Sequence, residues 1–233
     1  MNKYVKNIVQ ELGVKVPDFE CPEIGQTPDE LLFQLNVVSL LQPKIIIEIG
    51  SSTGGHIYLL STVLNDKNHE IITIDPWIED SKYGKNYRVY CDCISNLREF
   101  NKHIKFNHIR KLSQSSRALE ALKNLLKDKK IDFLFIDGSH AEEDVLQDWK
   151  NYKDLVADDG LIGFHDVVGY SGAKAAWKKI VKELNPEYST RVINKPGIPL
   201  LKGWNDPVEL GIGYIYSRKL PEKVKYLLED NNS

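Results

Sequence analysis

The stretch KIIIEIGSSTGG, residues 44–55, carries the strongest fold signal in this chain. Three consecutive isoleucines are typical of a strand that is buried on both faces of a sheet. Glu48 stands near the end of this strand, and a run of Gly, Ser and Thr follows almost directly. Because such a loop leaves its backbone N–H groups accessible, the stretch predicts a ligand-binding turn beside an acidic side chain.

Strand and helix patterns alternate on both sides of this stretch. Helical spacing covers 27–43, 56–66, 89–101, 113–130, 141–156 and 172–184, and apolar strands cover 44–50, 70–76, 104–110, 131–138 and 160–167. The first helix has the capping-box residues Thr27 and Glu30, with Pro28 at its first position. A turn at 157–160, ADDG, is expected to stop the helix before the last of these strands.

This alternation predicts an α/β fold, a Rossmann-like doubly wound and mostly parallel seven-stranded sheet. The last two strands, 189–195 and 210–220, have no helix between them and are expected to form a C-terminal antiparallel hairpin. Their connection, 196–209, is rich in Pro and Gly and is either a lid or a solvated loop. The expected boundaries are an N-terminal extension over 1–26, one main domain over 27–220 and a C-terminal tail over 221–233.

Composition and charge exclude several function classes. A formal charge of −2 offers no general attraction for nucleic acid or an acidic membrane. No apolar run is long enough to span a bilayer, and the first residues lack the apolar core of a signal peptide, so a cytoplasmic location is expected. Cys21, Cys91 and Cys93 have neither disulfide nor zinc spacing. A small-molecule partner is therefore expected, and a homo-oligomer is left open.

Polar residues mark the carboxyl ends of all five predicted parallel strands. In doubly wound folds, ligands bind at this edge of the sheet. The residues at these ends are Glu48 to Gly50, Asp75, Ser113, Asp137 to His140, and His165 with Asp166. Since acids are costly to bury without a partner, four carboxylates at successive strand ends favour a polar ligand over helix capping alone.

The glycine-rich loop does not fit a nucleotide phosphate. A P-loop ends in Gly-Lys-Ser/Thr, but this loop continues Gly54, Gly55, His56. Dinucleotide loops need a second Gly where this chain has Ser52. A nucleoside with an amino-acid end fits better: Glu48 suits a cationic group, the loop amides suit a carboxylate, and Asp75 suits ribose hydroxyls.

These residues form a pattern that resembles the class I S-adenosylmethionine-dependent methyltransferases. Glu48, Gly50 and Gly54 form E-x-G-x-x-x-G, an acid ends the second strand, and a hairpin closes the sheet. The resemblance spans roughly 30–218, so 27–220 is expected to be a methyltransferase domain. It implies S-adenosylmethionine as cofactor and these cofactor-binding residues: Glu48, Gly50, Ser51, Ser52, Thr53, Gly54, Gly55, Asp75, Pro76, Trp77, Ser113 and Asp137.

The segments FIDGSH and GFHDV narrow the resemblance. Asp137 and His140 after one strand, and His165 and Asp166 after the next, resemble the bacterial small-molecule O-methyltransferases related to cephalosporin-hydroxylase-like, sugar and macrolide enzymes. This resemblance implies methyl transfer to a hydroxyl of a sugar or natural product. These four residues are the expected catalytic set, with His140 as the leading general base.

The same resemblance implies a divalent cation, Mg²⁺ or another, with Asp137, Asp166 and His165 as ligands. A hard cation could hold a substrate hydroxyl and lower its pKa. Imidazole is a poor Mg²⁺ ligand, however. The alternatives are therefore a different metal, or no metal and acid–base work by histidine.

Three rival functions stay open at this point. The first is a non-catalytic methyltransferase-like binding protein, and the second is nucleic-acid methylation. The third is an NAD(P)-dependent short-chain-type oxidoreductase, because Tyr170 and Lys174 form Y-x-x-x-K after the fifth strand. The acceptor pocket is expected from 79–110 and 195–209, with Trp204 as a candidate contact. Trp149 and Trp177 are expected in the core.

Overall fold

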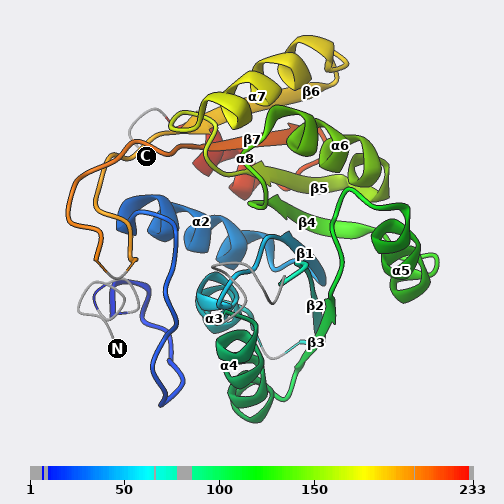
Figure 1. Cartoon of the computed structure of the whole chain (residues 1–233). Helices are drawn as coiled ribbons and strands as arrows, with labels where there is room; N and C mark the ends of the chain where they lie inside the picture. The colour runs from blue at the N-terminus through cyan, green and yellow to red at the C-terminus, as the bar shows by residue number, and fades with distance from the viewer. Residues whose placement is uncertain (1–6, 8–9, 66, 78–85, 202, 231–233) are drawn as a thin grey trace.

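The computed structural model describes residues 7, 10–65, 67–77, 86–201 and 203–230 (Figure 1). Its seven-stranded sheet has the order β3-β2-β1-β4-β5-β7-β6. The strands are β1 Ile45–Ile49, β2 His69–Ile74, β3 Ile104–Ile109, β4 Ile131–Ile136, β5 Val156–Phe164, β6 Tyr188–Ile193 and β7 Ile212–Ser217. Strands β1 to β5 pair in parallel, while β7 runs antiparallel to both β5 and β6. The predicted fold and hairpin are confirmed.

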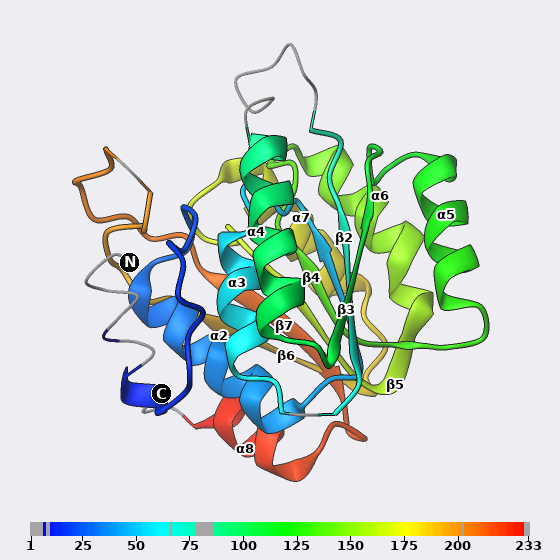
Figure 2. The same cartoon turned by 90° about the horizontal axis from the view of Figure 1, so that it is seen from below.

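Helices cover both faces of this sheet (Figures 1 and 2). One face carries α2 Pro28–Leu41, α3 Gly55–Thr62, α4 Asn86–Phe100 and α8 Glu222–Glu229; the other carries α5 Ser116–Leu126, α6 Glu142–Tyr152 and α7 Ser171–Glu183. Two apolar cores result, one on each side, with Ile46 facing the first and Ile47 the second. Alternate residues of each buried strand thus meet different helices, which explains why the strands are apolar throughout.

Local sequence signals explain several of these boundaries. The capping box of α2 forms as predicted, with the Thr27 side chain accepting from the backbone N–H of Glu30 and Pro28 at the first position. The turn expected at 157–160 is not present. These residues belong to β5, where the pairing with β4 shifts register between Ile131 and Phe133, so the extra length is absorbed as an irregularity within the strand.

Segments near both ends of the described chain pack against the main domain. The expected C-terminal tail contains α8, which contacts α2 and buries Val224 and Leu228 completely. At the other end, Tyr58 of α3 donates a hydrogen bond to the carbonyl of Pro17 at 3.1 Å. No helix among the described residues is long and apolar enough to cross a membrane.

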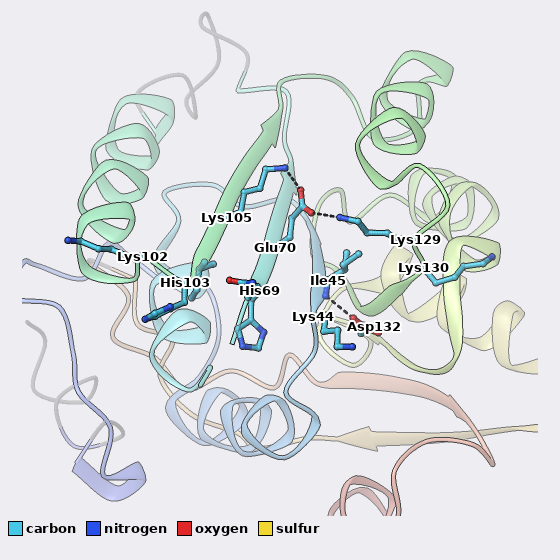
Figure 3. A pocket seen from close by; sticks show the side chains of 12 residues that line it. Lys44, Ile45, His69, Glu70, Lys102, His103, Lys105, Lys129, Lys130 and Asp132 are labelled. Atoms are coloured by element: carbon cyan, nitrogen blue, oxygen red, sulfur yellow. Dashed lines mark hydrogen bonds and ion pairs between the residues drawn. The ribbon is translucent and has the colours of Figure 1, made fainter. Parts of the chain in front are cut away.

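A hollow of about 640 Å³ lies at the amino ends of β1 to β4 (Figure 3). The buried carboxylate of Glu70 lies in the wall of this hollow. It accepts hydrogen bonds from Lys105 at 2.9 Å, Asn107 at 2.7 Å and Lys129 at 3.2 Å. This hollow is at the opposite edge from the strand-end acids, so it is separate from the predicted site.

Candidate functional site

The topology brings the predicted strand-end residues together at the carboxyl edge. Strand β1 lies between β2 and β4, and β4 lies beside β5. Backbone hydrogen bonds continue past the strand ends: Gly50 N–H donates to Ile74, Asp137 N–H to Ile49, and His165 N–H to Ile136, at 2.9, 2.9 and 3.0 Å. These hydrogen bonds therefore fix the backbone positions of Gly50, Asp137 and His165 at the sheet edge.

The glycine-rich loop approaches the next strand closely. Gly50 has φ 86°, and a Cβ on it would lie 2.0 Å from the carbonyl oxygen of Asp137. Gly54, at the same φ, is the N-cap of α3. Close contact and the left-handed conformation together require glycine at position 50, and the left-handed conformation alone favours it at position 54.

Part of this loop is already occupied by the N-terminal segment. Thr53 donates its side-chain hydrogen bond to the carbonyl of Glu23 at 2.8 Å, and a Cβ on Gly55 would lie 2.4 Å from the same oxygen. Ser51 differs: its buried hydroxyl has no hydrogen-bond partner among the described residues. Ser52 is exposed. Of the predicted loop residues, Ser51 and Ser52 are thus the side chains left for a ligand.

Asp75 lies directly beside this loop. Its two carboxylate oxygens accept from the backbone N–H groups of Ser52 and Trp77, both at 2.9 Å. Burial raises the pKa of the Asp75 carboxyl group, and the backbone hydrogen bonds oppose this shift. The backbone N–H of Ser51 acts on the same carboxylate, whose roughly four acceptor positions still leave room for a further donor.

Trp77 takes a different position from Pro76. Its side chain is 1% exposed, packs against Tyr90 with ring centroids 4.5 Å apart, and donates its indole N–H to the carbonyl of Ser52 at 2.8 Å. Pro76 is half-buried. Trp77 therefore supports the loop from behind, whereas Pro76 remains at the surface of the predicted site.

Glu48 is 1% exposed and points toward α3 and α2. Its Oε1 contacts His56 Nδ1, and His56 Nε2 lies 3.0 Å from Gln34 Oε1. Its second oxygen is buried without a hydrogen-bond partner among the described residues. The acid predicted at this strand end is therefore part of a buried polar chain, with one acceptor left over.

Asp137, His140, His165 and Asp166 form one cluster, as predicted from their strand ends. His165 Nδ1 lies 3.1 Å from Asp137 Oδ1 and 3.4 Å from Asp166 Oδ1. His140 Nε2 lies 2.7 Å from Asp166 Oδ2, and its ring stacks on Tyr170 at a centroid distance of 3.9 Å. His165 and Asp166 are buried, whereas His140 is exposed at the rim.

Charge coupling inside this cluster shifts the pKa values. Burial alone would lower the pKa of His165, but the carboxylates of Asp137, Asp166 and Glu30 outweigh it and raise that pKa well above its usual value. Burial would raise the pKa of Asp166, but hydrogen bonds from both histidines hold it far below its usual value. The hydrogen bond to Asp166 raises the pKa of His140, and burial raises that of Asp137.

One oxygen each of Asp137 and Asp166 and one nitrogen of His140 lie within 4.8 Å of one another, close enough to share a metal ion. This set differs from the predicted one, which had His165. The Nδ1 of His165 faces the two carboxylates, and the Nε2 of His165 lies 3.7 Å from Glu30 Oε2. The structure brings His140 into this role because the loop after β4 turns it back over Asp166.

Two residues that the sequence did not assign to the site touch this cluster. Gln26 donates its amide N–H to Asp137 Oδ2 at 2.6 Å. Glu30, completely buried, faces His165 and accepts from the backbone N–H of Gly211 at 2.7 Å. The signal at Glu30 was visible only as a capping box, and Gln26 carried no motif.

Ser113 lies at the end of β3, held by α6. Its carbonyl accepts from Tyr152 Oη at 2.6 Å, and its side chain bonds Asp148. The N-cap of α5 is Ser115, so Ser113 is free of capping. Burial raises the pKa of Asp148 to about 7, and its Oδ1 has no hydrogen-bond partner among the described residues.

The prediction that Trp149 and Trp177 lie in the core is confirmed. Trp149 and Trp177 pack on Phe164 at 5.9 and 5.6 Å between centroids, in the second core. Trp204 is 43% exposed in the connection between β6 and β7. Lys174 is exposed on α7, one turn after Tyr170. The acceptor-pocket prediction for 79–110 falls partly on 78–85, which lie outside the described residues.

Comparisons with known proteins add a family. A family model described as a methyltransferase domain matches residues 47–167. No curated protein matches the chain. An O-methyltransferase from Bacillus cereus in complex with SAH is similar in structure, with 16% identity, coverage of 93% of this chain and 92% of that chain, and a TM-score of 0.59.

Two further solved structures resemble the chain. The O-methyltransferase TomG from Streptomyces achromogenes, involved in tomaymycin synthesis and in complex with SAM, has 16% identity, coverage of 93% and 90%, and a TM-score of 0.57. CalS11, a TDP-rhamnose 3′-O-methyltransferase in calicheamicin biosynthesis, has 14% identity, coverage of 78% of each chain, and a TM-score of 0.53. At these identities the likeness shows the fold.

Proposed function

The chain belongs to the methyltransferase-domain family whose model matches residues 47–167, and from this premise we propose that it transfers a methyl group from S-adenosylmethionine to a hydroxyl of a small molecule. A sugar or a natural product is the acceptor class that we expect. The observation that carries the proposal is the pairing, at one sheet edge, of the glycine-rich loop with the Asp137, His140, His165 and Asp166 cluster.

The residues at this edge fit the cofactor. The buried Ser51 hydroxyl and Glu48 Oε2 lack partners within the described chain, and Asp75 has lone pairs left beside the exposed Ser52. Ser51, Glu48 and the loop amides would hold the amino-acid end. Asp75 would hold the ribose. Pro76 and Ser113 flank the loop on the side where the base would lie, and Asp137 closes the other side.

The chemistry of the cluster suits a hydroxyl acceptor. Bound S-adenosylmethionine supplies a methyl group on a positively charged sulfur. The chain must then hold the acceptor oxygen in line and take its proton. His140 is the base that we propose, because its ring is exposed at the rim and its Nε2 is held by Asp166.

The hydrogen bond to Asp166 also tunes this base. It raises the pKa of His140, which makes the imidazole a stronger base but reduces the neutral fraction near pH 7. Turnover should therefore be lost as the pH falls below the raised pKa of His140. His165 is shielded by its three carboxylate neighbours and serves to hold Asp137 and Asp166 in place.

A divalent cation is the finer part of the proposal. Asp137, His140 and Asp166 provide two oxygens and one nitrogen within reach of one ion. Two hard carboxylates and one imidazole suit Mn²⁺ better than Mg²⁺. If the ion binds, it would lower the pKa of the acceptor hydroxyl, and His140 would then act as a ligand rather than as the base.

The surroundings support a small acceptor. The net charge is −2, so the chain has no general attraction for a nucleic-acid backbone. The family membership also disfavours the oxidoreductase alternative, in which Tyr170 and Lys174 would act on NAD(P). A non-catalytic binding protein is the alternative that the experiment below separates. The cytoplasmic location and a homo-oligomer stay predictions.

Calorimetric titration with S-adenosylmethionine, and separately with NADH, tests this proposal. Micromolar binding of S-adenosylmethionine, weakened at least tenfold in Asp75→Ala, is expected, with no binding of NADH. Each titration is repeated with Mn²⁺, with Mg²⁺ and with EDTA, and a metal isotherm lost in Asp166→Ala would support the ion. Absence of S-adenosylmethionine binding would refute the proposed function.

A panel of sugar and phenolic acceptors, followed by release of S-adenosylhomocysteine, then separates catalysis from binding. His140→Ala is expected to spare cofactor binding and to lower turnover by about 100-fold, in the range of a lost general base. A protein that binds the cofactor but turns over no acceptor would favour the non-catalytic alternative.

A further inference from the structure

Residues 23–30 connect three parts of the proposed site. The carbonyl of Glu23 accepts from Thr53 in the glycine-rich loop at 2.8 Å. Ile24 N–H donates to the Leu200 carbonyl, and Leu200 N–H donates to the Gln26 carbonyl, both at 3.3 Å. The segment before α2 and the connection between β6 and β7 therefore lie side by side, as both views show (Figures 1 and 2).

The Gln26 side chain leaves this segment and enters the catalytic cluster. It is 1% exposed, and its Nε2 donates to Asp137 Oδ2 at 2.6 Å. The other oxygen of Asp137 lies 3.1 Å from His165 Nδ1. Both oxygens of the Asp137 carboxylate are thus hydrogen-bonded. Rotation of the carboxylate about the Cβ–Cγ bond would break at least one of these two hydrogen bonds.

Stability alone does not explain a glutamine here. Its Oε1 is buried and has no hydrogen-bond partner within the described chain. Leaving a buried polar atom unpaired costs roughly 1 to 3 kcal/mol, which offsets the roughly 1.5 to 3 kcal/mol gained from a hydrogen bond to a charged group. The polar residue is expected at this position because its amide acts on Asp137.

We propose that Gln26 is a positioning residue for the methyl-transfer site: it orients the Asp137 carboxylate toward the bound ligands. The inference rests on the proposed function and extends it to the segment outside the predicted methyltransferase domain. Since the Gln26 carbonyl accepts from the Leu200 N–H, the connection between β6 and β7 holds the backbone from which this side chain extends.

The variant Gln26→Met tests this role because methionine keeps the length of the side chain and removes its amide. Binding is measured by calorimetry for S-adenosylmethionine and by electron paramagnetic resonance for Mn²⁺. We expect Mn²⁺ affinity to fall about 10- to 100-fold, as for other residues that orient a metal ligand, and cofactor affinity to fall about threefold or more. The melting temperature should change little, because the loss of the unpaired oxygen and the loss of the donor to Asp137 Oδ2 oppose each other.

The control is Val224→Ala, a buried truncation in α8 on the far side of α2. It should lower the melting temperature and leave both affinities unchanged. A double-mutant cycle with Asp137→Ala adds a second readout: if Gln26 acts through Asp137, then Gln26→Met should change neither affinity further in the Asp137→Ala background. This cycle also separates positioning from poor folding, because poor folding of Gln26→Met would lower the affinities in the Asp137→Ala background as well.

The outcomes are distinguishable. If the wild-type protein binds the ligands and folded Gln26→Met binds them equally well, Gln26 has no positioning role. If the wild-type protein binds S-adenosylmethionine but not Mn²⁺, the cofactor affinity alone decides, and an unchanged value overturns the inference. If the wild-type protein binds neither ligand, the proposed function fails, and the inference that rests on it fails as well.

Discussion

Gly50 shows how strongly one residue constrains the site. Its φ is 86°, and a Cβ added there would lie 2.0 Å from the Asp137 carbonyl oxygen, so any side chain would be both strained and overlapping. We expect Gly50→Ala to lower the free energy of unfolding by at least about 2 kcal/mol, as measured by urea denaturation. Gly203, at φ 85° with no atom within 4 Å of its Cβ position, is the matched control.

Gly203→Ala carries the strain of the left-handed conformation without the overlap, so its cost should be about 1 kcal/mol. Equal losses in the two variants would show that the approach of β1 and β4 at Gly50 is not tight. Cofactor binding should also weaken in Gly50→Ala, because the loop would have to shift away from Asp137.

Asp148 predicts a pH dependence of stability. Burial raises the pKa of its carboxyl group from 3.8 to about 7 in the folded state. The folded protein therefore binds this proton more tightly than the unfolded chain does, and the stability from it is present below pH 4 and lost as the pH rises through 7. Wild type should lose on the order of 2 kcal/mol relative to Asp148→Asn between pH 5 and pH 8.

Urea denaturation of both proteins at the two pH values measures this difference. An identical pH dependence in wild type and Asp148→Asn would mean that Asp148 is ionised in the folded protein. Gln114, which donates to Asp148 Oδ2 at 3.0 Å, would then be the group that keeps the charge paired.

At the scale of elements, Glu70 joins β2 to β3 and to Lys129, two residues before β4, at the amino edge of the sheet (Figure 3). Its side chain is 10% exposed, but those of Lys105 and Lys129 are 64% and 58% exposed, which screens both ion pairs. We expect Glu70→Ala to cost about 1 to 2 kcal/mol of unfolding free energy, mainly through the buried acceptor and Asn107.

The hydrogen bonds from both lysines lower the pKa of Glu70 against the effect of burial. A lowered carboxyl pKa contributes stability above its unfolded value, near 4.5, and loses it as the pH falls through the folded value. The gap between wild type and Glu70→Ala should therefore shrink below pH 4. Glu222→Ala, which removes a 90% exposed partner of Lys225, should show no measurable gap at any pH.

At the scale of the whole molecule, α8 completes the core under α2. Leu228 is completely buried, whereas Tyr226 on the same helix is 76% exposed. Leu228→Ser should lower the free energy of unfolding by about 3 kcal/mol, because it removes buried apolar surface and buries a hydroxyl. Tyr226→Ser should be neutral. Equal stability in both variants would show that α8 is detached in solution.

Much of the fold could be predicted from the sequence because its signals are local. A capping box, apolar runs and strand-end acids operate within a few residues, and they correctly placed the sheet, the hairpin and the edge where Asp75, Asp137 and Asp166 meet. The turn at 157–160 was wrong because these residues continue β5 as the irregularity between its two stretches that pair with β4. Register is a property of two strands and is not visible in one.

The contacts inside the site were decided by tertiary structure. Glu48 lies in a strand that is apolar on both faces, so no alternation in the sequence showed that it would face α3 and His56. The approach of His140 to the two carboxylates, beside His165, depends on how the loop after β4 returns over β5. Gln26 and Asp137 are 111 residues apart, and their hydrogen bond exists only because the segment before α2 is held against Leu200. Local patterns therefore determined which residues reach the carboxyl edge, and long-range packing decided which of them touch.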